Sequence, residues 1–239
     1  MTSDHVTTGS ILSRAFGLFG MGFVPFLSIS LLVHSPLLLW NLARAVGGAA
    51  NPMAELIEAF LSNLLLAPLA SAALIHGVFR SLRGEGSTVG ECLRVGLSRW
   101  ISVLVLALLA GLAVFGATLA FVVPGIVVAC GLFVAVPALV VEELPIRSSF
   151  RRSWQLTGGY KLSIFGVLLL LAVLGWMFGA VLGLLTAGAE ALAPVVSFLG
   201  LLLTVALSAV QAIAAAVAYH DLRVHKEGLD EEELAAVFE

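Results

Sequence analysis

Long apolar stretches dominate this sequence, and they limit what the chain can fold into more than any other feature. Six of them run over residues 24–43, 56–79, 101–121, 126–141, 162–187 and 195–219. A helix needs about 20 mostly apolar residues to cross a bilayer, where lipid offers no partners for backbone polar groups. Charged residues make up only 11% of the chain, against roughly 25% in soluble domains. The sequence therefore predicts an all-α polytopic membrane protein with six transmembrane helices.

Basic residues are distributed unevenly between the two sides of these six stretches. Eleven of the twelve Lys and Arg residues fall in the N-terminal segment, in the links after the second and fourth stretches, and after the sixth. Only Arg44 falls on the other side. Cytoplasmic loops carry the excess of Lys and Arg, so both termini are expected in the cytoplasm. The polar N-terminus has Asp4 and no basic region, which predicts that the first span is not a cleaved signal peptide.

The connections between the spans are expected to be short. Residues 47–52 are small and turn-forming, and a tight turn is expected around Glu190 and Pro194. Pro124 with Gly125 is expected to separate the third and fourth spans, because proline lacks an amide hydrogen. The prediction is one integral membrane domain over residues 1–219, followed by an acidic cytoplasmic tail over residues 220–239.

A short amphipathic stretch precedes each odd-numbered span, at residues 8–19, 88–99 and 145–157. Thr88 and Glu91 at the start of the second stretch have the spacing of a capping box, which indicates a helix start. The predicted unit is an amphipathic helix followed by two spans, present three times in parallel orientation. Internal repeats often bracket a central site in transporters, but duplication of a stable hairpin is the simpler interpretation.

The third amphipathic stretch is the main candidate for contact with lipid. Arg147, Arg151 and Arg152 share its polar face, and Trp154 lies on its apolar face. This pattern is typical of a helix that lies in the plane of the headgroups. Each Arg near an anionic membrane surface contributes about 1 kcal/mol to binding.

Two carboxylates, Glu142 and Glu143, close the fourth span. We expect them to pair with Arg151, Arg152 or Arg80 and to tie the amphipathic helix to the ends of the spans. The alternative for Glu142 is a direct contact with a lipid headgroup or a protein partner.

The central and terminal stretches resemble a known family. The segment VVPGIVVACGLFVAVPALVVEELPIRSSFRRSWQLTGGYK, residues 122–161, carries Glu142 followed by Ser153, Trp154, Leu156 and Gly158. Together with GSILSRAFGLFGMGFVPFL near the start and AYHDLRVHKEGLDEEEL near the end, it resembles the multi-pass membrane domain attached to some bacterial glycerophosphodiester phosphodiesterases, and the stand-alone relatives of that domain. The resemblance implies the topology and the amphipathic segment of that family, in a bacterial inner membrane. In fused members catalysis belongs to a separate soluble domain, so the resemblance argues against an enzyme.

Direct search of the sequence gives no catalytic residues, no metal site and no cofactor. HExxH, GxSxG and Walker A motifs are absent from the sequence, and no basic stripe with aromatics indicates nucleic acid. His220 and His225 beside Asp221 are too loosely spaced for a metal site. Cys92 and Cys130 are expected to be apolar packing residues.

Three polar residues, His34, Asn63 and Gln211, lie within predicted spans. Polar residues in membrane interiors often line ion or proton paths. They also form hydrogen bonds between helices, which contribute about 0.6 kcal/mol on average. We favour the structural interpretation, because the sequence places no carboxylate in the middle of a span.

Gly175, Gly179 and Gly183 form a double GxxxG register in the fifth span. Small residues at this spacing let helices approach closely. Packing within one subunit is the simpler expectation, and a homo-oligomer interface is the alternative.

These observations favour a non-catalytic membrane scaffold or a lipid-associated accessory protein, with membrane lipids as its partners. Two alternatives stay open. One is a small permease or channel with a water-filled path at His34, Asn63 or Gln211. The other is a membrane subunit that binds a soluble enzyme at its cytoplasmic face.

Overall fold

The computed structural model describes residues 6–47, 52–188 and 193–228, and within these ranges the regular structure is helical. Its elements are α1 (Thr8–Met21), α2 (Phe23–Gly47), α3 (Pro52–Phe60), the π-helix η1 (Leu61–Leu66), α4 (Ala67–Leu82), α5 (Val89–Ala120), α6 (Val122–Leu132), α7 (Ala135–Val141), α8 (Ile146–Thr157), α9 (Lys161–Gly188) and α10 (Ala193–Glu227).

Six helical segments are long and apolar enough to cross a membrane. They are Phe23–Ala43, Leu56–Leu82, Val89–Ala120, Val122–Val141, Lys161–Leu185 and Val195–Glu227. This confirms the all-α class and the prediction of six helices that are long and apolar enough to span a membrane. The predicted loop at 47–52 and the turn at Glu190 fall mostly on residues outside the described ranges.

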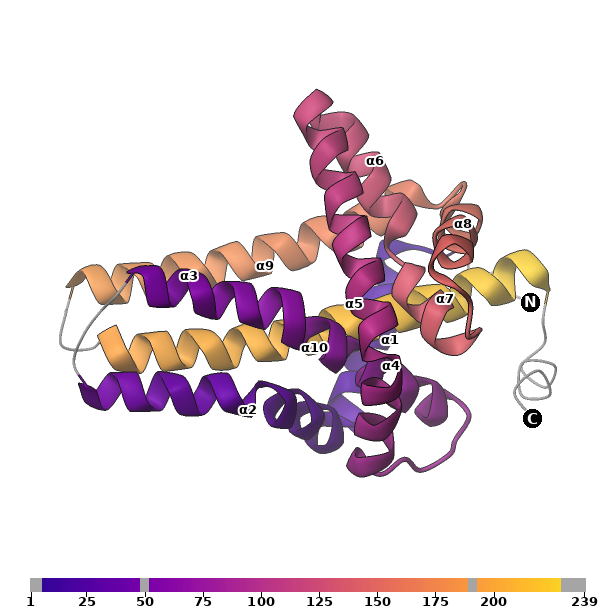
Figure 1. Cartoon of the computed structure of the whole chain (residues 1–239). Helices are drawn as coiled ribbons and strands as arrows, with labels where there is room; N and C mark the ends of the chain where they lie inside the picture. The colour runs from indigo at the N-terminus through magenta and orange to yellow at the C-terminus, as the bar shows by residue number, and fades with distance from the viewer. Residues whose placement is uncertain (1–5, 48–51, 189–192, 229–239) are drawn as a thin grey trace.

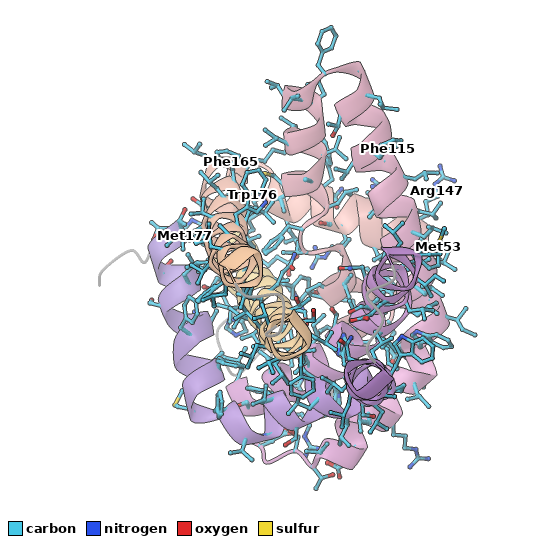
Figure 2. The ribbon with its side chains drawn as sticks, turned by 90° about the vertical axis from the view of Figure 1, so that its left-hand side faces the viewer. Met53, Phe115, Arg147, Phe165, Trp176 and Met177 are labelled. Carbon is cyan, nitrogen blue, oxygen red and sulfur yellow. The ribbon has the colours of Figure 1, made fainter. Side chains whose placement is uncertain are left out.

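Helix α10 is the centre of the bundle. Its spanning window is 61% buried, whereas the windows of α5 and α9 are only 11% and 6% buried. Small residues such as Ala209, Ala212 and Ala216 on α10 are buried and let its neighbours approach closely. The large exposed side chains of α5 and α9 suit a lipid environment, and Phe115, Trp176 and Met177 point outward from the ribbon (Figure 2).

The six spans do not all run in one direction. Helices α2, α9 and α10 extend alongside one another toward one end of the molecule, as Figure 1 shows. The hairpin of α5 and α6 projects away from this group. The helices meet around α4, α7 and the C-terminal half of α10, where most of the buried side chains lie.

The amphipathic stretches differ from one another in the structure. The first and third are separate helices, α1 and α8, but the second continues without a break into the third span as α5. The Thr88–Glu91 capping box is present at the start of α5. Between Arg99 and Ile101 the chain has neither glycine nor proline, so nothing ends the helix there.

Two boundaries also differ from the predictions. The break between α5 and α6 is at Phe121, whose backbone is extended, and Pro124 then lies in the first turn of α6, where its missing amide hydrogen costs nothing. Helix α10 has 35 residues, which at 1.5 Å each is about 50 Å and exceeds the roughly 30 Å hydrocarbon core. Residues 220–227 are therefore the last turns of this helix rather than a tail, and residues 229–239 lie outside the described ranges.

Candidate functional site

The sequence of α8 separates a buried face from an exposed one. Pro145 precedes its first turn, and Gly159 follows its end with a positive φ of 89°, which glycine adopts without strain. The small side chains of Ser149, Ser153 and Thr157 are fully buried. Their spacing of four residues places them on one face of the helix, away from the exposed Arg147 and Arg151.

Helix α8 is docked on the carbonyl of Gly131, in the last turn of α6. The Ser153 hydroxyl donates to this carbonyl at 2.8 Å, and the Thr157 hydroxyl donates to it at 3.3 Å. The last carbonyls of a helix lack partners within the helix, so α8 satisfies one that α6 leaves open. A Cβ at position 131 would overlap the ring of Trp154, so only glycine permits this approach. The contact fixes α8 against the membrane domain.

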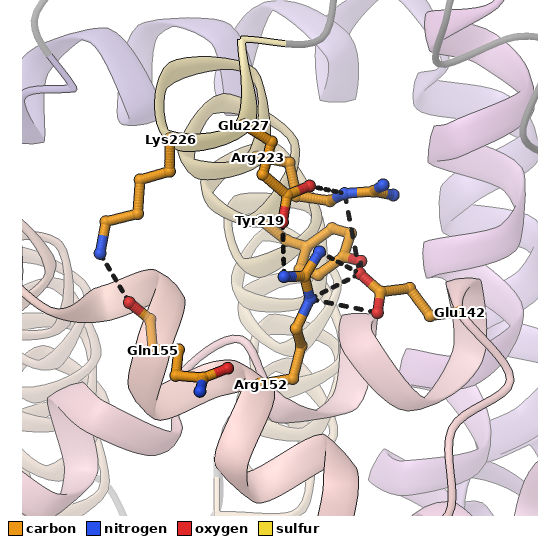
Figure 3. A network of polar contacts seen from close by, with 7 residues as sticks. All are labelled: Glu142, Arg152, Gln155, Tyr219, Arg223, Lys226 and Glu227. Carbon is orange, nitrogen blue, oxygen red and sulfur yellow. Dashed lines mark hydrogen bonds and ion pairs between the residues drawn. The ribbon is translucent and has the colours of Figure 1, made fainter.

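A polar network then joins α8 to α7 and α10 (Figure 3). The Arg152 Nε atom lies 2.9 and 3.1 Å from the two carboxylate oxygens of Glu142, and Tyr219 donates its hydroxyl to the same carboxylate. Arg152 also forms an ion pair with Glu227. Arg223 donates to Glu227 at 3.0 Å and lies 3.7 Å from Glu142.

The network contains two guanidinium groups and two carboxylates, so its formal charges balance. Burial works against the charge of Arg152, but its hydrogen bonds to Glu227 and Glu142 prevail and raise its pKa above the ordinary value. Lys226 adds one more link, because its ammonium donates to the Gln155 carbonyl at 2.6 Å. Paired charges of this kind tolerate partial burial, whereas an unpaired one does not.

The predicted lipid-contact residues therefore divide into two groups. Glu142 and Arg152 form the expected pair and are turned inward, while Glu143 pairs with Arg99 instead of an arginine of α8. Arg147 and Arg151 are exposed, and Arg147 projects from the molecule in Figure 2. Among the described residues, no ion-pair partner lies near either of them. We call Arg147 and Arg151 the α8 basic face.

Trp154 borders the α8 basic face and is 42% exposed. The Lys161 ammonium lies 3.8 Å from the centre of its ring, a cation–π contact. Tryptophan with an apolar body and a polar edge is enriched at membrane–water interfaces. Helix α8 thus carries two exposed guanidiniums and one partly exposed tryptophan, and its other face is fixed by hydrogen bonds.

The three intramembrane polar residues do not come together. His34 is buried, and its Nδ1 atom donates to the Ser30 carbonyl at 2.9 Å, since a carbonyl can only accept. Asn63 of η1 and Gln211 of α10 are both exposed. The structure also has a partly buried polar pair that the sequence did not indicate. The Asn41 amide donates to the Glu58 carboxylate.

The glycine register of α9 makes little contact inside the subunit. A Cβ at Gly175 would meet only the Leu207 side chain, at 3.9 Å, and a Cβ at Gly179 or Gly183 would meet open space. The packing role of this register stays a prediction.

The candidate metal ligands give no cluster. Within the described ranges, no group of three or more His, Cys, Asp or Glu side chains converges on one point. His220 lies 3.4 Å from the Asp221 carboxylate, which forms an ion pair with Arg14 of α1. Cys92 and Cys130 are buried, as their expected packing role requires.

Sequence reasoning missed the contribution of α10 to the site. The sequence places Tyr219 at a span end and Arg223 and Glu227 in a tail, yet they are three of the five residues that join α7, α8 and α10. Their spacing of four residues, on a helix continued past the apolar segment, is the signal that would have placed them on one face.

Comparison of the chain with protein-family models, curated proteins and solved structures finds no match. The resemblance to the phosphodiesterase-associated membrane domain therefore stays a prediction.

Proposed function

We propose that the protein is a non-catalytic integral protein of the bacterial inner membrane that presents the α8 basic face to anionic lipid headgroups. The single observation that supports this most is the exposure of Arg147 and Arg151 on a helix whose other side is fixed by Gly131 and the Glu142–Arg152 pair. A preorganised pair of guanidiniums loses little conformational freedom when a phosphate binds.

The proposed orientation has both termini and α8 in the cytoplasm. It rests on the excess of Lys and Arg in the connections on that side. Arg14 of α1 pairs with Asp221 of α10, so the two ends of the described chain lie together, as an even number of crossings requires. In this orientation the α8 basic face meets the negatively charged leaflet.

The test is retention of phosphatidylglycerol by the full chain in native mass spectrometry. We expect R147Q/R151Q to retain this lipid on the order of tenfold less than the unmodified protein, because each charge contributes about 1 kcal/mol. The matched control is R83Q, which removes an exposed arginine at the end of α4, outside the α8 basic face. Equal retention by R147Q/R151Q and the unmodified protein would overturn the proposal.

The two alternatives have less support. A permease path lined by His34, Asn63 and Gln211 has less support because His34 is buried, whereas Asn63 and Gln211 are exposed. A soluble protein partner at the α8 basic face is the second alternative. Purification in which a stoichiometric protein co-elutes, and is lost in R147Q/R151Q, would favour the partner over lipid.

A further inference from the structure

A second polar surface lies between the end of α4 and the first turns of α5, away from α8. It is an open groove of about 390 Å³, lined by His76, Arg80, Glu91, Arg94, Val95 and Ser98. None of these residues belongs to the α8 basic face, so a ligand of this groove is independent of the proposed function.

The groove contains charges of both signs. Arg80 is held at its wall by Glu85 at 3.1 Å and Glu91 at 3.5 Å. Arg94 is exposed and has no ion-pair partner among the residues described. The Ser98 hydroxyl donates to the Val95 carbonyl at 2.8 Å, which leaves its oxygen available to accept. The lining therefore offers a guanidinium donor at one point and carboxylate and hydroxyl acceptors beside it.

An apolar track continues from the groove along α5. Ile101, Val105 and Leu108 are exposed, and they follow Arg94 and Ser98 at alternating spacings of three and four residues. Residues at these spacings share one face of a helix. One leaflet is about 15 Å deep, which corresponds to roughly ten helical residues. The track is thus long enough for the acyl chain of a lipid whose headgroup lies in the groove.

From this combination we infer that the groove between α4 and α5 binds a glycerophospholipid with an ammonium-bearing headgroup, of the phosphatidylethanolamine class. Arg94 contacts the phosphate, Glu91 and the Ser98 oxygen accept from the ammonium, and the acyl chain lies on Ile101, Val105 and Leu108. A purely anionic headgroup fits less well, because Glu91 repels it.

The experiment measures lipid retention by native mass spectrometry in the R147Q/R151Q background, so that lipid bound to α8 does not contribute. We expect phosphatidylethanolamine to be retained above phosphatidylglycerol, and R94Q to lower retention of phosphatidylethanolamine about tenfold, as for loss of one charge-assisted hydrogen bond. E91Q keeps the capping box, since glutamine also suits that position, and it should abolish the preference between the two lipids.

Soluble phosphoethanolamine distinguishes a lipid from a small phosphate ester. It lacks the acyl chains, so a roughly 100-fold excess is expected to leave the bound lipid in place. Three results would each overturn the inference. One is that R94Q retains phosphatidylethanolamine as well as the background variant does, and another is that the background variant retains both lipids equally. The third is displacement of the bound lipid by phosphoethanolamine. As a folding control, R94Q and E91Q should unfold at the same temperature as the background variant. A loss of lipid binding then does not come from a loss of folded protein.

Discussion

At the scale of single residues, Gly131 decides whether α8 is able to dock. Its carbonyl accepts from Ser153 and Thr157, and its missing side chain makes room for the Trp154 ring. Overpacking of such a contact costs typically about 1–3 kcal/mol. We expect G131A to lower the thermal unfolding temperature of the purified protein clearly.

The matched control for this substitution is G179A, because a Cβ at Gly179 meets open space. It should leave the unfolding temperature unchanged or raise it slightly, since alanine favours helix by up to about 1 kcal/mol. A loss of stability in G179A equal to that in G131A would contradict the roles assigned to both glycines.

Two neighbouring arginines of α8 have different surroundings, so their substitution should change the free energy of unfolding by different amounts. Arg152 contacts Glu142 and Glu227, and its side chain is 23% exposed, whereas Arg151 faces outward. R152Q removes one of the two cations of the network and leaves Arg223 beside both Glu142 and Glu227. It should cost about 2 kcal/mol after allowance for solvent screening. R151Q should change stability by less than about 0.5 kcal/mol. Chemical denaturation of both variants in the same detergent measures the difference.

At the scale of the helices, the start of α5 carries four of the six residues that line the groove, and it depends on one cap. The Thr88 side chain accepts from the Glu91 amide, and the Glu91 carboxylate accepts from the Thr88 amide. Loss of such a cap costs about 1 kcal/mol. We expect T88A to speed amide hydrogen exchange in residues 89–95 and to leave exchange beyond Ile101 unchanged, while T88S restores the slow rates. Faster exchange along the whole helix would instead indicate that α5 folds as one unit from this end.

Local sequence signals predict the helices well, but they do not predict the side-chain contacts between helices. The apolar stretches, the capping box at Thr88 and the start of a helix after Pro145 all follow from short-range chemistry. The inward turn of Arg152 does not, because it depends on Tyr219 and Glu227, which belong to a helix far along the chain. Nor does the π-helix at 61–66, where the Leu65 carbonyl accepts from the Trp100 indole at 3.0 Å.

At the scale of the whole molecule, exposure differs between spans of similar hydropathy. The windows of α5, α9 and α10 have mean hydropathy of 2.5, 2.5 and 2.2, yet only α10 is largely buried. Hydropathy therefore predicts which segments enter the membrane, whereas the small residues of α10 decide which one lies at the centre.

This arrangement predicts which spans touch lipid. A photoreactive group placed in the acyl chain should label Trp176 and Met177 of α9 and Phe115 of α5, which are all more than 60% exposed. It should not label the buried Ile213 of α10. Mass spectrometry of the digested protein locates the labels. Protection of α9 together with a dimeric mass would instead favour the homo-oligomer interface at Gly179.

The position of α10 at the end of the described chain has a consequence for biogenesis. Arg14 pairs with Asp221 across 207 residues, and Glu142 and Arg152 also find partners on this last helix. Chains are synthesised from the N-terminus, so these earlier side chains have no partner on α10 until its final turns leave the ribosome. A nascent protein that stalls before residue 219 therefore lacks Asp221 as the partner of Arg14, and the Glu142–Arg152 pair lacks its contacts with Tyr219 and Glu227.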